Sequence, residues 1–424
     1  MGGTAGKATS NSAASSTTMD GLPIMEIPGS YGLPLLGPLR DKLAFYWTEG
    51  VPDFFDNRLK KYKSSVFRMN MIFFLLQGVR EGCRMNMIPG PPYWKSCPVI
   101  MCVDQKSYRT LFDTEAVDKT DILIGTFLAS WKYSGGYRTT PYLDSSEERH
   151  TKLKALFIEV CKRSKPRIFP EFHRLMSEVF VKWESGLKQK GEVDFSDDLT
   201  LAALRFNFKA FYNADPADPT VEANLGKEAS KVVKPWLIPL VLPLLVFKDD
   251  IPTLLKPILA PVVELLTHTF PVPYGLIKPQ HEKIVAYFRA NAKEVLDVAE
   301  TKFGLDREDA LHNLLFSSCF NSWGGIQFLF PDIVKRVSST SPEYQKELSA
   351  EVRKAVRENG GITPEALSSM PLVQSVVYEI LRLDPPVPYQ FGIARKDLIL
   401  ESHDAAFRVK KGEMLAGYMR TDGG

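Results

Sequence analysis

The stretch between residues 149 and 383 constrains the fold most, because apolar residues recur along it at helical spacing with few strand-like runs. Two helix ends are well marked: Thr363 is a capping hydroxyl before Pro364, and Gly360-Gly361 ends the preceding helix. No sequence feature marks a domain boundary, so we expect one large core rather than two or three domains. The expected helices are Arg149–Cys161, Phe172–Lys188, Asp198–Tyr212, Pro279–Lys302, Arg307–Phe330, Glu343–Glu358 and Pro364–Leu383.

Short β elements flank this helical stretch. We expect strands near residues 65–69, 98–104, 398–400 and 407–409, with further helices at 41–63 and 106–112. The predicted fold class is therefore mainly α with small β elements. Residues 1–22 are rich in Ser, Thr, Ala and Gly, so we expect a disordered tail followed by a single domain over residues 23–424.

A five-residue repeat interrupts the first expected hairpin. The run Arg68-Met69-Asn70-Met71-Ile72 recurs as Arg84-Met85-Asn86-Met87-Ile88. Two copies are too few for a repeat architecture, so we interpret residues 72–87 as a duplicated insertion. The insertion places an apolar run inside the hairpin, which is a local conflict between sequence and fold.

Composition excludes several function classes. A formal net charge of +3 predicts no nucleic-acid binding and no acidic partner. The five cysteines are irregularly spaced, which argues for a reducing compartment, and neither cysteine nor histidine spacing predicts a zinc site. The N-terminal tail lacks arginine and carries Asp20, so it only weakly resembles a transit peptide.

The segment Pro235–Phe247 is intensely apolar but too short to span a bilayer, and it contains three prolines. One interpretation is buried core or channel lining. The other is a surface that dips into a membrane to admit an oily substrate. We favour the first, and keep peripheral membrane association as the alternative.

Glu379 and Arg382 lie three residues apart near the end of an apolar helix, so their charges share one face. Alone this spacing indicates little, because surface ion pairs are common and contribute little stability. Here the pair stands directly before Asp384-Pro385-Pro386-Val387-Pro388. A buried ion pair ahead of a rigid proline turn is typical of heme-thiolate cytochromes.

Further motifs make this resemblance specific. The sequence resembles the plant fatty-acid hydroperoxide cytochromes of the P450 type, which comprise allene oxide synthases, hydroperoxide lyases and divinyl ether synthases. The resemblance implies a heme-thiolate cytochrome fold with heme b. It rests on Ile27-Pro28-Gly29-Ser30-Tyr31-Gly32, Ser134-Gly135-Gly136-Tyr137-Arg138, Tyr142-Leu143-Asp144, His268-Thr269-Phe270-Pro271, Asn321-Ser322-Trp323-Gly324-Gly325, Pro385-Pro386-Val387-Pro388 and Lys411-Gly412-Glu413.

The resemblance also implies a mechanism. Such enzymes take polyunsaturated fatty-acid hydroperoxides, whose own O–O bond supplies the oxidant, so neither O2 nor a reductase is needed. Asn321 would lie over the heme, where an amide can donate a hydrogen bond to the hydroperoxide without delivering a proton. The alternative is that Asn321 only marks a kink beside Gly324-Gly325.

Other site residues follow from the resemblance. Leu123 stands where allene oxide synthases typically carry phenylalanine, and Pro141 where they carry serine. Both departures favour lyase-like or divinyl ether synthase-like chemistry, with allene oxide synthase as the alternative. Lys119, His150 and Lys154 match positions that offer cations to the heme propionates, although Lys154 could equally be an exposed basic side chain.

The family's heme ligand is a cysteine located beyond the Lys-Gly-Glu turn. In this sequence no cysteine follows Cys319, so we expect a chain truncated before the ligand, with weak heme binding. Two rival hypotheses remain: a heme-free remnant that binds lipid, and an oxygen-using monooxygenase. The family is often plastidial, which predicts a plastid location with the cytosol as alternative.

Overall fold

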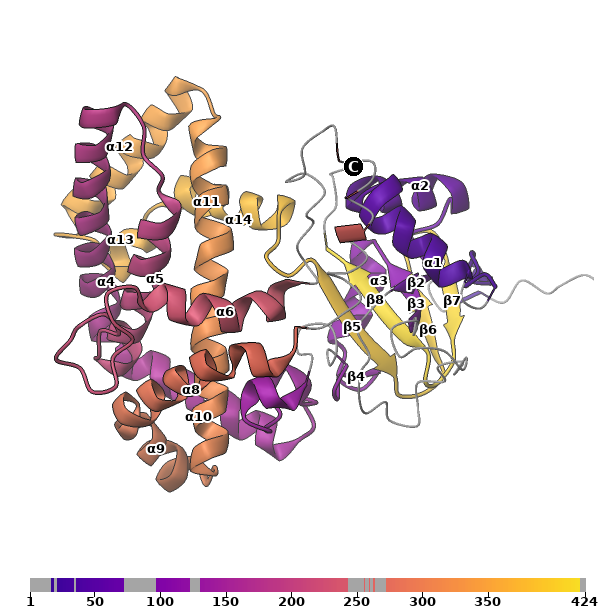
Figure 1. Cartoon of the computed structure of the whole chain (residues 1–424). Coiled ribbons are helices and arrows are strands. Elements are labelled where there is room, and N and C mark those ends of the chain that lie inside the picture. The colour runs from indigo at the N-terminus through magenta and orange to yellow at the C-terminus, as the bar shows by residue number, and fades with distance from the viewer. Residues whose placement is uncertain are drawn as a thin grey trace, which may run out of the picture.

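A computed structural model shows a helical part and a β part that lie side by side (Figure 1). The helical part carries most of the chain between residues 130 and 383. The β part combines the N-terminal residues with the end of the chain. The structure describes residues 17–18, 21–33, 36–71, 97–122, 130–242, 255, 259, 262–263 and 272–419.

Helices make up most of the described chain, which confirms the predicted fold class. The helices of the β part are α1 (Leu36–Leu43), a π-helical turn (Ala44–Thr48), α2 (Val51–Tyr62) and α3 (Gln105–Arg109). Those of the helical part are α4 (Glu148–Lys190), α5 (Ser196–Tyr212), α6 (Ala229–Val241), α8 (Tyr274–Asn291), α9 (Lys293–Phe303), α10 (Arg307–Phe316), a π-helical segment (Ser317–Gly324), α11 (Gly325–Ser338), α12 (Pro342–Glu358), α13 (Pro364–Ser368) and α14 (Pro371–Leu383).

Within the described residues the β part forms two small sheets. The larger has the strand order β2-β3-β8-β5-β4, and only its β3–β8 pair is parallel. The smaller has the order β1-β7-β6. Both sheets thus join segments from opposite ends of the chain. The strands are β1 (Ile24–Met25), β2 (Val66–Met71), β3 (Cys97–Cys102), β4 (Val117–Asp118), β5 (Tyr389–Ala394), β6 (Leu398–Glu401), β7 (Ala406–Val409) and β8 (Met414–Tyr418).

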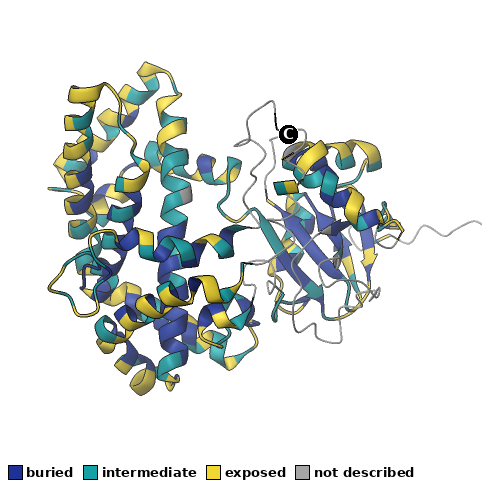
Figure 2. Cartoon of the chain, in the orientation of Figure 1, coloured by how far each residue is buried: buried dark blue, intermediate teal, exposed yellow. Residues whose placement is uncertain are grey.

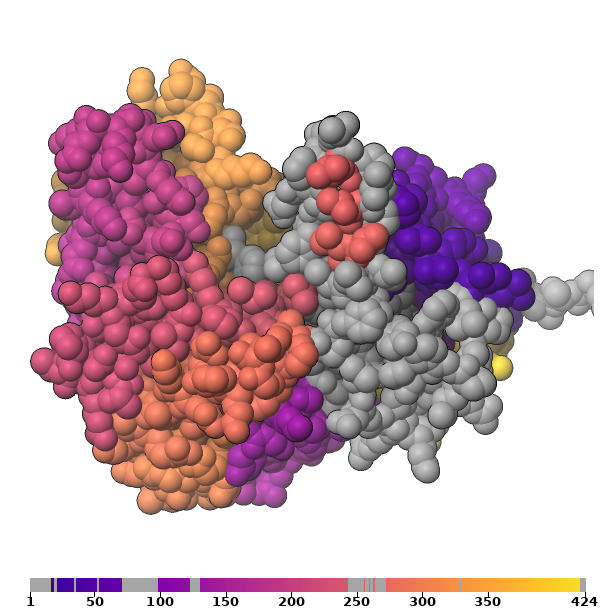
Figure 3. All heavy atoms as spheres, viewed as in Figure 1, coloured from indigo at the N-terminus to yellow at the C-terminus, as the bar shows by residue number. Residues whose placement is uncertain are grey.

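Each part has a buried interior of its own, as Figure 2 shows. In the helical part the core centres on α10 and the π-helical segment, with Trp236 and Trp323 fully buried. In the β part, Phe55 of α2 belongs to the same buried cluster as Phe67, which projects from β2 of the larger sheet. In the space-filling view, α6 and α8 lie side by side on the surface of the helical part (Figure 3).

The structure corrects the expected break between residues 161 and 172. A single helix, α4, runs through this region with Pro166 and Pro170 inside it. Each proline removes one backbone donor and normally kinks or ends a helix. Both prolines are exposed on the outer side of α4, where water can hydrate the carbonyls that lose a partner. The helix therefore continues.

Three other boundaries differ from expectation. The helix expected at residues 279–302 starts earlier, at Tyr274, and is interrupted at Ala292 between α8 and α9. The helix expected at 364–383 is interrupted before Pro371, which starts a new helix as a first-turn proline. The helix expected at 307–330 contains the π-helical segment and extends to Ser338.

The predicted helix ends at Thr363 and Gly360 are confirmed. The Thr363 hydroxyl accepts a hydrogen bond from the Ala366 backbone N–H at 3.1 Å. Gly360 has a φ of 69°, the left-handed conformation that glycine adopts freely after a helix.

In the apolar segment 235–247, α6 contributes the buried residues Trp236, Leu237, Leu240 and Val241, which supports the core interpretation. The duplicated segment 72–87, most of the tail 1–22 and the motif 268–271 lie outside the described residues. Among the helices that are described, none combines the length and apolar character needed to cross a bilayer.

Candidate active-site cavity

An apolar cavity of about 400 Å³ lies between the helical part and the β part. Its size and mostly apolar lining are those of a small-molecule site. The cavity has contributions from both parts of the molecule, so it exists only in the folded chain. The described lining residues are Lys119, Ile122, Thr140, Pro141, Tyr142, Leu143, His150, Val241, Phe316, Phe320, Asn321, Gly324, Gly325, Pro386, Val387, Tyr389, Gln390 and Phe391.

The π-helical segment forms one wall of this cavity. Asn321 lies on the wall with an exposed side chain, next to Phe320 and one turn before Gly324. Cys319 and Trp323 are buried on the other side of the same segment. A π-helical turn bonds each carbonyl to the N–H five residues on, and such turns occur frequently at functional sites. α10, the π-helical segment and α11 form one continuous helix, the central helix, which is distorted at the position where the amide reaches the cavity.

A second wall is the short turn Thr140–Tyr142, which carries Pro141. This turn is tied to α10 by Asn313, whose side-chain oxygen accepts from the Thr140 backbone N–H at 2.9 Å and from its hydroxyl at 3.0 Å. The Asn313 amide nitrogen donates to Asp309 at 2.9 Å. The wall that bears Pro141 is thus attached to the helix that leads to Asn321.

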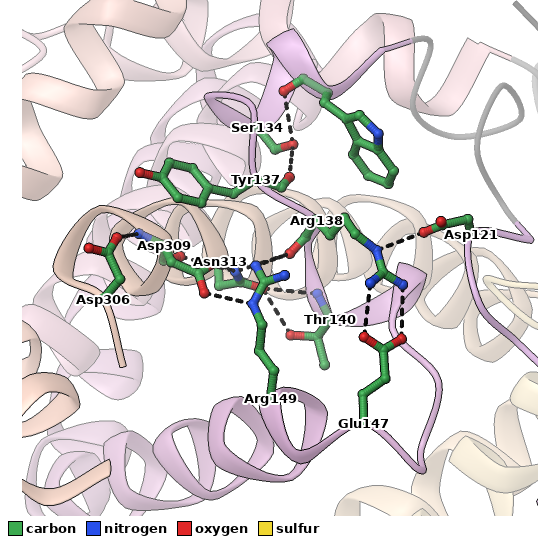
Figure 4. A network of polar contacts seen from close by, with 11 residues as sticks. Asp121, Ser134, Tyr137, Arg138, Thr140, Glu147, Arg149, Asp306, Asp309 and Asn313 are labelled. Atoms are coloured by element: carbon green, nitrogen blue, oxygen red, sulfur yellow. Dashed lines mark hydrogen bonds and ion pairs between the residues drawn. The ribbon is translucent and has the colours of Figure 1, made fainter. Parts of the chain in front are cut away.

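Two arginines complete this network (Figure 4). Arg138 forms a bidentate pair with Glu147, with distances of 2.8 and 2.9 Å, and reaches Asp121 at 2.8 Å. Arg149, from the first turn of α4, pairs with Asp309 and donates to the Arg138 carbonyl at 2.7 Å. Bidentate arginine–carboxylate pairs have a fixed geometry, so the network holds the turn in place relative to α4 and α10.

Lys119 and His150 place an ammonium group and an imidazole at one edge of the cavity. Burial lowers the pKa of Lys119, and the Asp144 carboxylate opposes this shift. Burial, followed by the charge of Lys154, lowers the pKa of His150. Burial would raise the pKa of Asp144, but hydrogen bonds from Ser146, Lys119 and Arg395 together hold it well below its usual range. An anion bound at this edge would raise the pKa of both side chains.

The remaining predicted residues lie elsewhere. Lys154 is exposed on α4 and is not among the lining residues, although its charge acts on His150. Leu123 lies outside the described residues. Glu379 and Arg382 do pair, at 2.7 and 2.8 Å, but their side chains are 54% and 43% exposed. The expected burial of this pair is not met, because these side chains lie on the outer face of α14.

Sequence reasoning missed two parts of the cavity. Tyr389, Gln390 and Phe391 of β5 line it opposite the helices. Aromatic residues directly after a proline turn could have indicated this strand. The bond between Thr140 and Asn313 joins positions 173 residues apart, and no local pattern predicts such a contact.

A long helix over an apolar cavity, set between a helical part and small sheets, is the arrangement of the cytochrome P450 class, and comparisons with known proteins show the same class. The family model for cytochrome P450 matches residues 339–415. Among solved structures, the retinoic-acid-bound cyanobacterial CYP120A1 has a TM-score of 0.59 over 94% of this chain and 77% of its own. At 16% identity, that likeness shows the fold alone.

Curated relatives narrow the class to one family. The chloroplastic allene oxide synthase of Arabidopsis thaliana is 40% identical over 96% of this chain and 73% of its own length. Allene oxide synthase 1 of Solanum lycopersicum is 38% identical over 94% and 69%. A divinyl ether synthase of Selaginella moellendorffii is 37% identical over 93% and 76%. The chain belongs to the cytochrome P450 family that contains these allene oxide and divinyl ether synthases.

Family membership implies heme as cofactor. The described residues of the cavity suit its macrocycle and its propionates. The cavity wall formed by side chains such as Phe316, Phe320 and Val241 suits an apolar macrocycle, and Lys119 and His150 suit its propionates. The cysteines whose side chains the structure describes, Cys102, Cys161 and Cys319, do not line the cavity. The side chains that the structure describes therefore suit the macrocycle and its propionates, but none of them places a thiolate on the cavity wall.

Proposed function

We propose that this protein acts in oxylipin biosynthesis and converts polyunsaturated fatty-acid hydroperoxides, without O2 or a reductase, by rearrangement or cleavage. The observation that carries the proposal is the position of Asn321, whose amide lies on the wall of an apolar cavity with Lys119 and His150 at its edge. The family of the chain supports the same substrate class.

Different residues of the cavity would bind the cofactor, bind the hydrocarbon chain and orient the hydroperoxide. Lys119 and His150 would hold the heme propionates, and bound heme would supply the iron that breaks the O–O bond. The apolar wall, including Phe320, would bind the hydrocarbon chain and exclude water. The Asn321 amide would donate a hydrogen bond to the hydroperoxide and orient it. It would not deliver a proton, because an amide has no proton to release at neutral pH.

For the product, Leu123 and Pro141 support hydroperoxide lyase-like or divinyl ether synthase-like chemistry. Pro141 lines the cavity, where a proline offers no hydroxyl. A second candidate is allene oxide synthase, which the 40% identity to the Arabidopsis thaliana enzyme favours. Product analysis separates aldehydes, divinyl ethers and the hydrolysis products of an allene oxide.

The first experiment adds hemin to the purified chain and records its absorption spectrum. A Soret band with consumption of a fatty-acid hydroperoxide in the absence of a reductase is the expected result. Absence of a Soret band would refute heme-dependent activity of this chain and favour the lipid-binding remnant. A requirement for reduced nicotinamide would instead favour the oxygen-using monooxygenase.

For location, we propose the plastid, since several relatives are described as chloroplastic. The cytosol is the alternative. Peripheral membrane association through the apolar segment 235–247 stays the alternative to a core role, and it rests on Ile238 of α6, which is exposed next to the buried Leu237. Fluorescent tagging at the C-terminus tests the location in the cell. Co-sedimentation of the purified chain with lipid vesicles tests the membrane association.

A further inference from the structure

Helix α5 holds the π-helical segment from the side opposite the cavity. Asn207 donates from its amide nitrogen to the Ser318 carbonyl at 3.2 Å. The Tyr212 hydroxyl lies 2.7 Å from the Ser318 hydroxyl. The Trp323 indole N–H donates to the Thr200 carbonyl at 2.9 Å. Side chains and backbone of α5 thus bind the central helix both before and after Asn321.

Of these contacts, the hydrogen bond from the Asn207 side chain is the one that goes to the backbone of the π-helical segment. Asn207 is 0% exposed, and its side-chain oxygen has no hydrogen-bond partner in the described structure. A buried amide with an unsatisfied oxygen destabilises the fold relative to an apolar side chain of the same shape. The contribution of Asn207 must therefore come from its donor bond to the Ser318 carbonyl.

That bond influences the helix register, meaning whether the backbone of the segment makes π-helical or α-helical hydrogen bonds. A helix is distorted where a side chain competes for its carbonyls, because the regular backbone bond is then weakened. A donor on the Ser318 carbonyl accordingly stabilises the π-helical form over the α-helical one. Changing the π-helical hydrogen bonds of the segment to α-helical ones would rotate one end of the helix by about 100° relative to the other. Asn321 would then no longer share a wall with Phe316 and Gly325, as it does now.

We propose that Asn207 is a positioning residue: through the Ser318 carbonyl it keeps the central helix in the π-helical register, and so directs the Asn321 amide into the cavity. What the amide does there rests on the proposed function, whereas the register does not. Helix α5 thereby helps to determine how a fatty-acid hydroperoxide is oriented, although it contributes no lining residue among those described.

The register is tested by amide hydrogen exchange on the whole chain, which needs no cofactor. Asn207→Leu removes the donor at nearly constant volume. We expect about fivefold faster exchange in peptides covering residues 317–325, the effect of one lost hydrogen bond, with α12 unchanged. The matched control is Tyr212→Phe, which removes a bond to the Ser318 side chain but leaves its carbonyl bonded, and should change exchange less than twofold.

Two exchange results would overturn the proposal. Unchanged exchange in Asn207→Leu would show that the bond does not hold the register. Equal acceleration in both variants, spreading into α5 and α10, would show a loss of packing rather than of register.

The consequence for Asn321 is tested with hemin and a fatty-acid hydroperoxide. We expect Asn207→Leu to lower kcat and shift the product ratio toward that of Asn321→Ala, with KM within twofold. The double variant should match Asn321→Ala alone, because the two changes act through one group. A wild-type product ratio in an Asn207→Leu variant with accelerated exchange would refute the link to Asn321. If the unmodified chain consumes no hydroperoxide, the proposed function fails while the exchange data still decide the register.

Discussion

Acidification should destabilise the protein through a buried histidine, His281 of α8. Its ring is 2% exposed and stacks against Trp236, with centroids 6.3 Å apart. The Tyr274 hydroxyl lies 2.9 Å from Nδ1, whereas Nε2 has no partner in the described structure. The ring of His312 lies 5.6 Å away. Burial, followed by the charge of His312, lowers the pKa of His281 from 6.5 to about 4.

The sign of the effect follows from which state binds the proton. Between pH 6.5 and about 4 the unfolded chain protonates this imidazole and the folded chain does not. Full stability is therefore present above pH 6.5 and is lost as the pH falls. At about 1.4 kcal/mol per pH unit the complete loss is about 3 kcal/mol, of which about 2 kcal/mol is already lost at pH 5.

The assay compares the unmodified chain with His281→Gln, in which an amide can still bond to the Tyr274 hydroxyl. Urea unfolding, followed by both tryptophan fluorescence and circular dichroism, is measured from pH 7.5 to about pH 5. The variant should lose about 2 kcal/mol less free energy of unfolding over this interval. The control is His403→Gln, whose native side chain is 63% exposed, so no buried imidazole is removed. The same pH slope in His281→Gln as in the unmodified chain would refute the reasoning.

Two further predictions concern the cavity edge and a tight turn. Lys119→Met and His150→Gln should each weaken hemin binding about tenfold, the effect of one charge-assisted hydrogen bond, whereas Lys154→Met should change it less than twofold; titration of the Soret absorbance checks this. Gly135→Ala should lower the free energy of unfolding by more than about 2 kcal/mol, because φ is 65° and a Cβ would stand 2.1 Å from the His312 ring. Gly136→Ala, with φ of 92° but open space, should lose only about 1 kcal/mol, and equal losses would contradict the steric argument.

Local sequence signals determined much of this protein. Helical periodicity and capping residues such as Thr363 predicted the helical part, since these patterns depend on neighbours within a few positions. The motif around Asn321 located one wall of the cavity, and Lys119 and His150 its charged edge. Asn321 belongs to a motif that carries the resemblance to the family, and Lys119 and His150 followed from that resemblance.

Tertiary structure decided what depends on contacts distant in sequence. Helix α4 passes through Pro166 and Pro170 because both face solvent, which no local rule could show. The π-helical register depends on a donor from Asn207, which lies 111 residues before the carbonyl it meets. Periodicity can predict that a helix forms, but the direction of a side chain such as Asn321 is set by packing against other helices. The candidate residues could thus be found in the sequence, while their arrangement around one cavity required the fold.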